Sequence, residues 1–252
     1  MPYRAPDLGD GVARCARYAF GPNRLHLCGP TTASREVFDY VRTGAADGGL
    51  EHLLTQFRTL YPYLQTIARA NRIRDPFDAR VVEAYWVGNE LLDAVTPQAS
   101  FRHLVDVVEL RKRLPAADAD RVIAKLRQGA RLHHSFHVLN LYRRTGNDPV
   151  AHTTETFANC LVTAGEVVSV DGPVFHVRTR PLVLNGHALA FGESIERRVV
   201  RRLWDDDLLA DAVTGDFVTL HWDTPCEVIS RTDAVRLHRM TERHVTLANQ
   251  TL

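Results

Sequence analysis

Hydrophobic residues in the first half of the chain recur with the spacing of amphipathic helices. Between residues 50 and 68 they follow the i, i+3, i+4, i+7 pattern, and Pro62 inside this run predicts a kink or a break at that position. Asp78 follows a turn and is placed to cap the next helix. Two further helical stripes are expected over residues 101–108 and 122–126.

The second half of the chain carries short alternating segments that are typical of strands. Two pairs of such segments flank Asp171-Gly172 and Asn185-Gly186, and both dipeptides predict hairpin turns. Another strand is expected over residues 217–222. Short strands at this spacing predict a small barrel or sandwich. The tail, residues 232–249, returns to helical periodicity.

These patterns predict an α+β fold with two domains. A helical N-terminal domain is expected over residues 1–146. A small β-barrel with a C-terminal helix is expected over residues 150–252. The boundary is placed in the polar segment 143–149, where the periodicity changes.

Composition narrows the classes of function. The 252 residues include 31 Lys and Arg against 30 Asp and Glu, a balance that does not favour nucleic acid or an anionic membrane as partner. No apolar run reaches the ~18–20 residues that span a bilayer, and residues 1–7 lack the pattern of a signal peptide. We therefore expect a cytoplasmic protein whose four cysteines are thiols. Hydrolase, P-loop and dinucleotide-binding motifs are missing from the sequence.

Two short motifs in the second half suggest a family. Cys160 is followed by four residues, Gly165, one residue and Val167. Later, residues 215–221 read Gly-Asp-Phe-Val-Thr-Leu-His and end at His221. In this order and separation the motifs resemble the HypC/HupF family of hydrogenase maturation chaperones, over about residues 157–240.

The resemblance implies an OB-like barrel and a role in handling iron. Members of that family carry an iron with cyanide and carbonyl ligands from a scaffold protein to the large subunit of nickel-iron hydrogenase. By position, the roles of their cysteine thiolate and strand histidine fall on Cys160 and His221. Thiolate with imidazole suits iron and other transition metals. The family cysteine follows the initiator Met, whereas Cys160 is internal, so a permanent metal site is an alternative, as is a purely structural Cys160.

A cluster of histidines gives a second candidate for metal binding. His133, His134 and His137 stand within five residues, and His133 and His137 share a face whether the segment is a helix or a strand. A third ligand is expected from His26 or Cys28, which lie between two Gly-Pro pairs predicted to bound a rigid loop. The alternative is a structural cluster beside a structural turn.

A pair of carboxylates is a further feature that could carry chemistry. Glu83 and Glu90 are seven residues apart and are expected on one helix face, with Gly88 inside the helix. The Glu-x-x-His arrangement of diiron bundles is missing, so their role stays undefined.

Three functions are compatible with these features. The first is a metal-handling accessory protein for a hydrogenase-like metalloenzyme, with a hydrogenase large subunit or a maturation scaffold protein as partner. The second is a non-haem metalloenzyme acting on a small molecule, with its site between the two domains. The third is an interaction module without a metal. Whether the protein is an enzyme is left open by the sequence, and iron is the first of several transition metals that fit.

Overall fold

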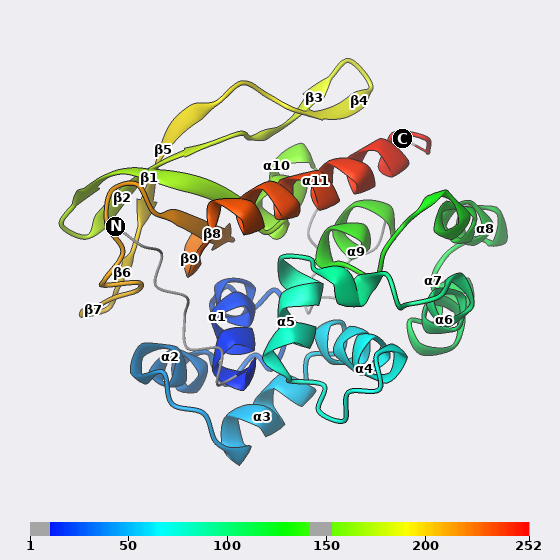
Figure 1. Ribbon diagram of the computed structural model, residues 1–252, viewed down its shortest axis with the longest axis horizontal. Coiled ribbons are helices and arrows are strands. Elements are labelled where there is room, and N and C mark those ends of the chain that lie inside the picture. Colours follow the sequence, from blue (N-terminus) through cyan, green and yellow to red (C-terminus); the bar gives the residue numbers. More distant parts are fainter. Residues whose placement is uncertain (1–10, 142–152, 252) are drawn as a thin grey trace.

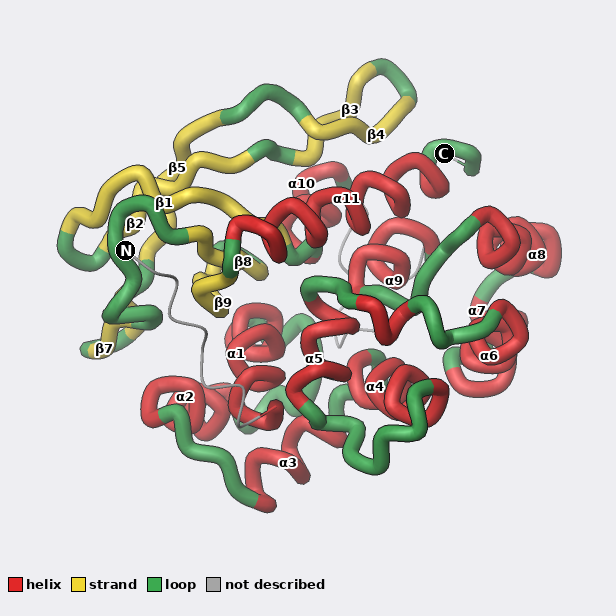
Figure 2. Tube along the Cα trace, viewed as in Figure 1, coloured by secondary structure: helices red, strands yellow, loops and turns green. Residues whose placement is uncertain are grey.

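A computed structural model describes residues 11–141 and 153–251. Helices form the first part of the chain, an antiparallel sheet follows, and one long helix ends it (Figures 1 and 2). The predicted α+β class is therefore confirmed. The predicted boundary between residues 146 and 150 lies outside the described residues, so the two-domain division stays a prediction. Within the described ranges, no helix is both long enough and apolar enough to cross a membrane.

The helical part consists of short elements that wrap around an apolar core. In chain order these are α1 (Gly11–Arg24), α2 (Ser34–Thr43), α3 (Gly48–Thr55), α4 (Leu60–Ala70), α5 (Ala79–Trp86), the 3-10 turn η1 (Glu90–Leu92), α6 (Pro97–Arg102), the π-helical turn η2 (His103–Val107), α7 (Leu110–Arg113), α8 (Ala116–Ala124), the 3-10 turn η3 (Lys125–Gln128), α9 (His134–Asn140) and α10 (Thr154–Cys160).

The structure agrees with one local prediction for this part and differs from two. The Asp78 side chain caps α5 by accepting from the Arg80 amide, as expected. The break in the 50–68 run lies at residues 56–59, before Pro62, because a proline is tolerated in the first turn of α4. Gly88 is not inside a helix: α5 ends at Trp86, and Gly88 has φ +93, which glycine adopts without strain.

The C-terminal part is a sheet followed by the long helix α11 (Arg231–Ala248). The antiparallel main sheet has the order β5-β2-β1-β8-β9, and both predicted hairpins, β1–β2 and β3–β4, are present. The helix predicted over 232–249 corresponds to α11. The strands are β1 (Thr163–Asp171), β2 (Val174–Thr179), β3 (Leu182–Asn185), β4 (Ala188–Phe191), β5 (Ile195–Val200), β6 (Arg202–Leu203), β7 (Asp206–Asp207), β8 (Phe217–His221) and β9 (Thr224–Ile229).

Closure of the sheet into a barrel is not found. Among the described strands, no hydrogen-bonded pairing joins the edge strand β5 to the other edge strand, β9. The two edges are linked by an ion pair between Arg197 of β5 and Asp223, in the turn between β8 and β9. The sheet therefore curls toward itself, and the OB-like barrel stays a prediction.

Helices α1 and α11 connect the helical part to the sheet. α1 packs against β8 and β9, and α11 packs against α9 and β1 (Figure 1). The largest apolar core consists mainly of helical residues, but Val162, Cys226 and Leu237 from the C-terminal part belong to it. The junction is therefore a continuous hydrophobic core, and it contains the candidate site.

Candidate metal site

Three metal-ligating side chains from different elements converge at this junction. His134 is the first residue of α9, Cys160 the last residue of α10, and His221 the last residue of β8. One potential ligand atom from each lies within 4.8 Å of the other two. Both histidines are buried, with 6% and 2% of their surface exposed, whereas Cys160 is half-buried. Cys160 is therefore the most exposed of the three residues.

Strand pairing explains why Cys160 and His221 meet. β1 begins three residues after Cys160, and its Thr163 pairs with Leu220, the residue before His221. The contact continues beyond the strands, since the Trp222 amide donates to the Asn159 carbonyl at 2.9 Å. The prediction that Cys160 and His221 lie close together is confirmed, while metal binding by them stays a prediction.

Close packing of α1 fixes the ring of His221. Its Nδ1 lies 2.7 Å from the Tyr18 carbonyl oxygen. One turn later, a β-carbon at Gly21 would lie 2.3 Å from the His221 carbonyl oxygen, so only glycine permits this approach. Since α1 ends at Arg24, Gly21 and Pro22 lie in its last turn. The prediction that this Gly-Pro pair bounds a loop is therefore wrong.

Substitution of Gly21 tests this close approach. Gly21→Ala is expected to lower the free energy of unfolding by about 1–3 kcal/mol, because the helix or strand must shift to relieve the overlap. Gly48→Ala is the control, since a β-carbon there meets nothing within 4 Å. Urea unfolding followed by circular dichroism measures both variants, and equal stabilities would show that α1 tolerates the extra methyl group.

Hydrogen bonds determine which nitrogen of each histidine carries the proton. A backbone carbonyl only accepts, so His221 is protonated at Nδ1, where it donates to Tyr18. His134 is likewise protonated at Nε2, which donates to the Cys160 carbonyl at 2.8 Å. The lone pairs are therefore at His221 Nε2 and His134 Nδ1. Histidine ligands of metals are usually oriented in this way, by donation of the other N–H to a carbonyl or carboxylate.

Aromatic side chains shield the imidazoles of His134 and His221 from solvent. The Trp86 ring lies 4.5 Å from the His134 ring and 5.4 Å from the His221 ring, and it stacks on Tyr18 at 5.3 Å. Burial, together with the neighbouring His221, holds the pKa of His134 well below its usual range. His134 is therefore neutral at physiological pH, which is the form that binds metals.

Comparison with known proteins places the chain in a family without assigning an activity. The profile of the DUF6390 family, described as a family of unknown function, matches residues 7–252. The chain belongs to this family. No curated protein and no solved structure gives a significant match.

The other two histidines of the cluster have structural partners. His133 precedes α9, and its Nδ1 accepts from the Ser135 amide as a helix cap. The Ser135 hydroxyl also bridges His133 Nδ1, at 2.8 Å, and His244 Nδ1, at 2.7 Å. His137 Nδ1 lies 3.1 Å from the Tyr63 hydroxyl. Of the three neighbouring histidines, only His134 belongs to the group with Cys160 and His221. The sequence had favoured His133 with His137 as ligands.

The predicted third ligands, His26 and Cys28, lie outside the three-residue cluster. His26 is exposed in the turn after α1 and has φ +58. Cys28 is half-buried, and its carbonyl accepts from the Asn23 side chain at 3.0 Å. Metal binding by His26 and Cys28 stays a prediction, and they are not part of the group formed by His134, Cys160 and His221.

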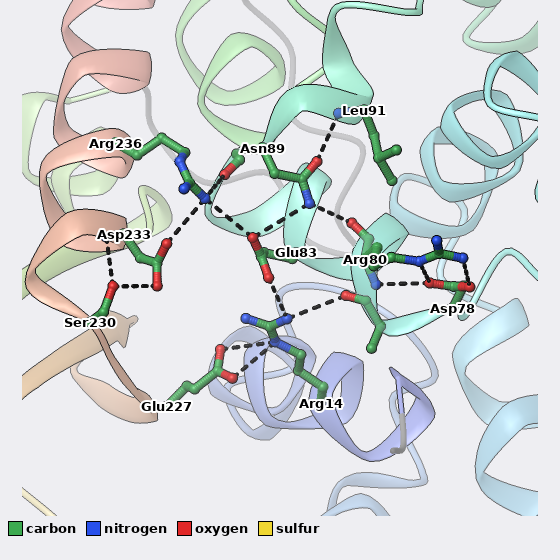
Figure 3. A network of polar contacts seen from close by, with 12 residues as sticks. Arg14, Asp78, Arg80, Glu83, Asn89, Leu91, Glu227, Ser230, Asp233 and Arg236 are labelled. Carbon is green, nitrogen blue, oxygen red and sulfur yellow. Dashed lines mark hydrogen bonds and ion pairs between the residues drawn. The ribbon is translucent and has the colours of Figure 1, made fainter. Parts of the chain in front are cut away.

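The two predicted carboxylates have different environments. Because α5 ends at Trp86, Glu83 and Glu90 do not share a helix face, and Glu90 is exposed. Glu83 instead forms ion pairs with Arg14 of α1 and Arg236 of α11 (Figure 3). Its role in the structure is to hold three helices together beside the site.

Proposed function

We propose that this protein binds one transition-metal ion through His134, Cys160 and His221, and that it handles this metal as an accessory protein. The convergence of these three ligand atoms within 4.8 Å carries the proposal. Two imidazoles and a thiolate suit iron, zinc and copper far better than magnesium or calcium. Three protein ligands also leave a coordination position for a further group.

The resemblance to the HypC/HupF family selects iron among these metals. Cys160 three residues before the first strand, and His221 at the end of the neighbouring strand, agree with the arrangement that the resemblance implies. The curled sheet, with Arg197 of β5 paired to Asp223, is compatible with an OB-like barrel. In this proposal the iron is cargo, received from a maturation scaffold protein and delivered to the large subunit of a hydrogenase-like enzyme.

Burial favours a second candidate function. His134 and His221 lie within the junction of helices and sheet, where a metal would be shielded from solvent. A resident ion with an open position is typical of metalloenzymes. The alternative is therefore a non-haem metalloenzyme that acts on a small molecule at this junction. Transfer of the metal ion distinguishes the two functions. A metal that is cargo must pass to a partner protein, whereas a resident ion stays bound during turnover.

Metal content is the direct test. Protein purified without oxygen is expected to hold about one equivalent of iron, and Cys160→Ser to lose most of it, because a hydroxyl replaces a thiolate poorly. Cys28→Ser is the comparison variant, since it changes another partly buried cysteine outside the cluster, and full retention of iron in it would exclude Cys28 as a ligand. Elemental analysis after gel filtration gives the stoichiometry. Equal metal content in wild type and Cys160→Ser, or a wild type that cannot be loaded, would refute the proposed site.

A further inference from the structure

A groove lies between α11 and the sheet. It has a volume of about 430 Å³ and is lined by α11 between Ala234 and Glu242, by the start of β1 and by the end of β2. Sites for small molecules typically have volumes of ~300–1,000 Å³. His134, Cys160 and His221 do not line the groove, so a ligand in it would be separate from the proposed metal.

Most of the accessible surface inside the groove is apolar. Val162 and Leu237 are buried at its base, and Phe191 and Phe217 are half-buried. Val235 of α11 lines the same groove and is 44% exposed. A ligand with an apolar body would remove this surface from water, which favours binding.

An arginine of the lining is held in place by neutral groups alone. Arg180 donates from Nε to the Gly192 carbonyl at 3.0 Å and from Nη2 to the Phe191 carbonyl at 3.2 Å. Its Nη1 lies 3.4 Å from Nε2 of His238, which must accept because arginine only donates. These contacts occupy three of the five N–H groups of the guanidinium. The cation therefore keeps donors for a ligand, and no carboxylate in the described part of the chain pairs with it.

The charges around Arg180 leave the groove positive. Arg178 lines it as well, but its charge is compensated by an ion pair with Glu166. Arg239 of α11 is exposed and has no ion pair within the described ranges. Together the lining residues include three arginines and two glutamates, the second being Glu242, so the net charge is +1. An anion is therefore favoured over a cation in this groove.

We propose that the groove binds a small organic acid, whose carboxylate pairs with the guanidinium of Arg180 and whose apolar body lies along α11. Arg180 follows β2 and is bonded to the end of β4, so the sheet positions the guanidinium before any ligand arrives. A donor that is already fixed loses little freedom on binding, and hydrogen bonds between arginine and carboxylate are strong because both groups are charged. This site goes beyond the proposed function, because its ligand needs no metal.

The first probe is 8-anilinonaphthalene-1-sulfonate, which combines an aromatic body with an anionic group and becomes fluorescent when it is buried. Metal-free full-length protein is titrated with it, and saturable binding of about one equivalent is expected. The acid 1-naphthoate and its neutral amide, 1-naphthamide, then compete for the site. The acid is expected to displace the probe at about tenfold lower concentration, because only a carboxylate forms charge-assisted hydrogen bonds with Arg180.

Arg180→Gln is expected to abolish this preference, so that acid and amide compete equally. Arg198→Gln is the control, since Arg198 is an exposed arginine of β5 that does not line the groove, and it is expected to keep the preference. Circular dichroism checks the fold of both variants. Equal competition by acid and amide in wild type, or an unchanged preference in Arg180→Gln, would overturn the inference, as would the lack of saturable probe binding. The wild-type comparison decides the matter even where a variant fails to fold.

Discussion

Acidification from pH 7 to pH 5 is expected to remove about 6 kcal/mol from the free energy of unfolding of the metal-free protein. The cause is a set of histidines that are buried in their neutral form. Burial lowers the pKa of His103 to about 3, that of His133 to about 3 and that of His137 to about 4. In the unfolded chain each returns to its usual pKa of about 6.5.

The difference in bound protons between the folded and unfolded states determines how stability changes with pH. Between pH 6.5 and pH 4 the unfolded chain binds more protons than the folded protein, so the free energy of unfolding falls as the pH falls. Each such histidine contributes a slope of ~1.4 kcal/mol per pH unit, and the stabilisation is fully present only above about pH 6.5. The expected loss approaches the whole stability of a typical domain, about 5–15 kcal/mol.

Guanidinium unfolding at a series of pH values measures this slope. His103→Gln is expected to reduce it by the contribution of one proton, because glutamine does not titrate. His52→Gln serves as the control, since His52 is exposed. A free energy of unfolding that stays constant from pH 7 to pH 5 would show that these histidines are not kept neutral by the fold.

Local signals in the sequence predicted the elements whose conformation is decided locally. The Asp171-Gly172 and Asn185-Gly186 turns form the expected hairpins, because two-residue turns with glycine fix the register of the flanking strands. The cap at Asp78 and the C-terminal helix were predictable for the same reason. The end of α5 was missed, because the residues after Trp86 keep an apolar pattern while Gly88 turns the chain.

The candidate site was only partly predictable. Motif spacing placed Cys160 beside His221, because strand pairing between β1 and β8 converts that spacing into proximity. His134 was passed over in favour of its neighbours, since the choice depends on where α9 begins. His133 caps that helix, although histidine is not among the favoured capping residues, and so His134 faces Cys160. Tyr85, whose hydroxyl lies 3.2 Å from Nδ1 of His134, reaches the site only through tertiary packing.

A chain of alternating charges beside the site was invisible in the sequence. It runs from Glu227 of β9 through Arg14 of α1 and Glu83 of α5 to Arg236 and Asp233 of α11 (Figure 3). Arg14 and Glu227 are 213 residues apart, so no local pattern reveals their pairing. The chain joins the helical part to the sheet, and it requires every buried charge to keep its partner.

Substitution of Arg14 is therefore expected to have a large effect on stability. Arg14 Nε lies 2.9 Å from Glu227 Oε1, and Arg14 Nη1 lies 3.0 Å from Glu83 Oε2. The side chains of Arg14 and Glu227 are 7% and 2% exposed. Arg14→Met removes the cation that pairs most closely with the buried Glu227 carboxylate. The remaining cation, Arg17, lies 3.9 Å from Glu227 and compensates its charge only in part. We expect the free energy of unfolding to fall by about 3–5 kcal/mol.

Two further variants separate this buried network from ordinary surface charges. Arg80→Met removes an arginine that is 64% exposed and pairs with Asp78, and it is expected to cost at most about 1 kcal/mol. Arg14→Met combined with Glu227→Gln is expected to recover part of the loss, because the carboxylate no longer needs a cation. Urea unfolding compares the variants, and an Arg14→Met protein as stable as Arg80→Met would contradict the prediction.

Arg14→Met is also expected to weaken metal binding, because Tyr18 connects Glu227 to His221. The Tyr18 hydroxyl donates to Glu227 Oε2 at 2.7 Å, and the Tyr18 carbonyl accepts from His221 Nδ1 at 2.7 Å. A shift of Glu227 therefore moves the residue that orients His221. Arg14→Met should weaken the binding of Zn(II), a redox-inactive probe of the site, more than Arg80→Met does, when both are titrated in the absence of denaturant. Equal affinities would show that the charge network stabilises the junction without positioning the ligand, because orientation of His221 would then depend on α1 packing at Gly21 alone.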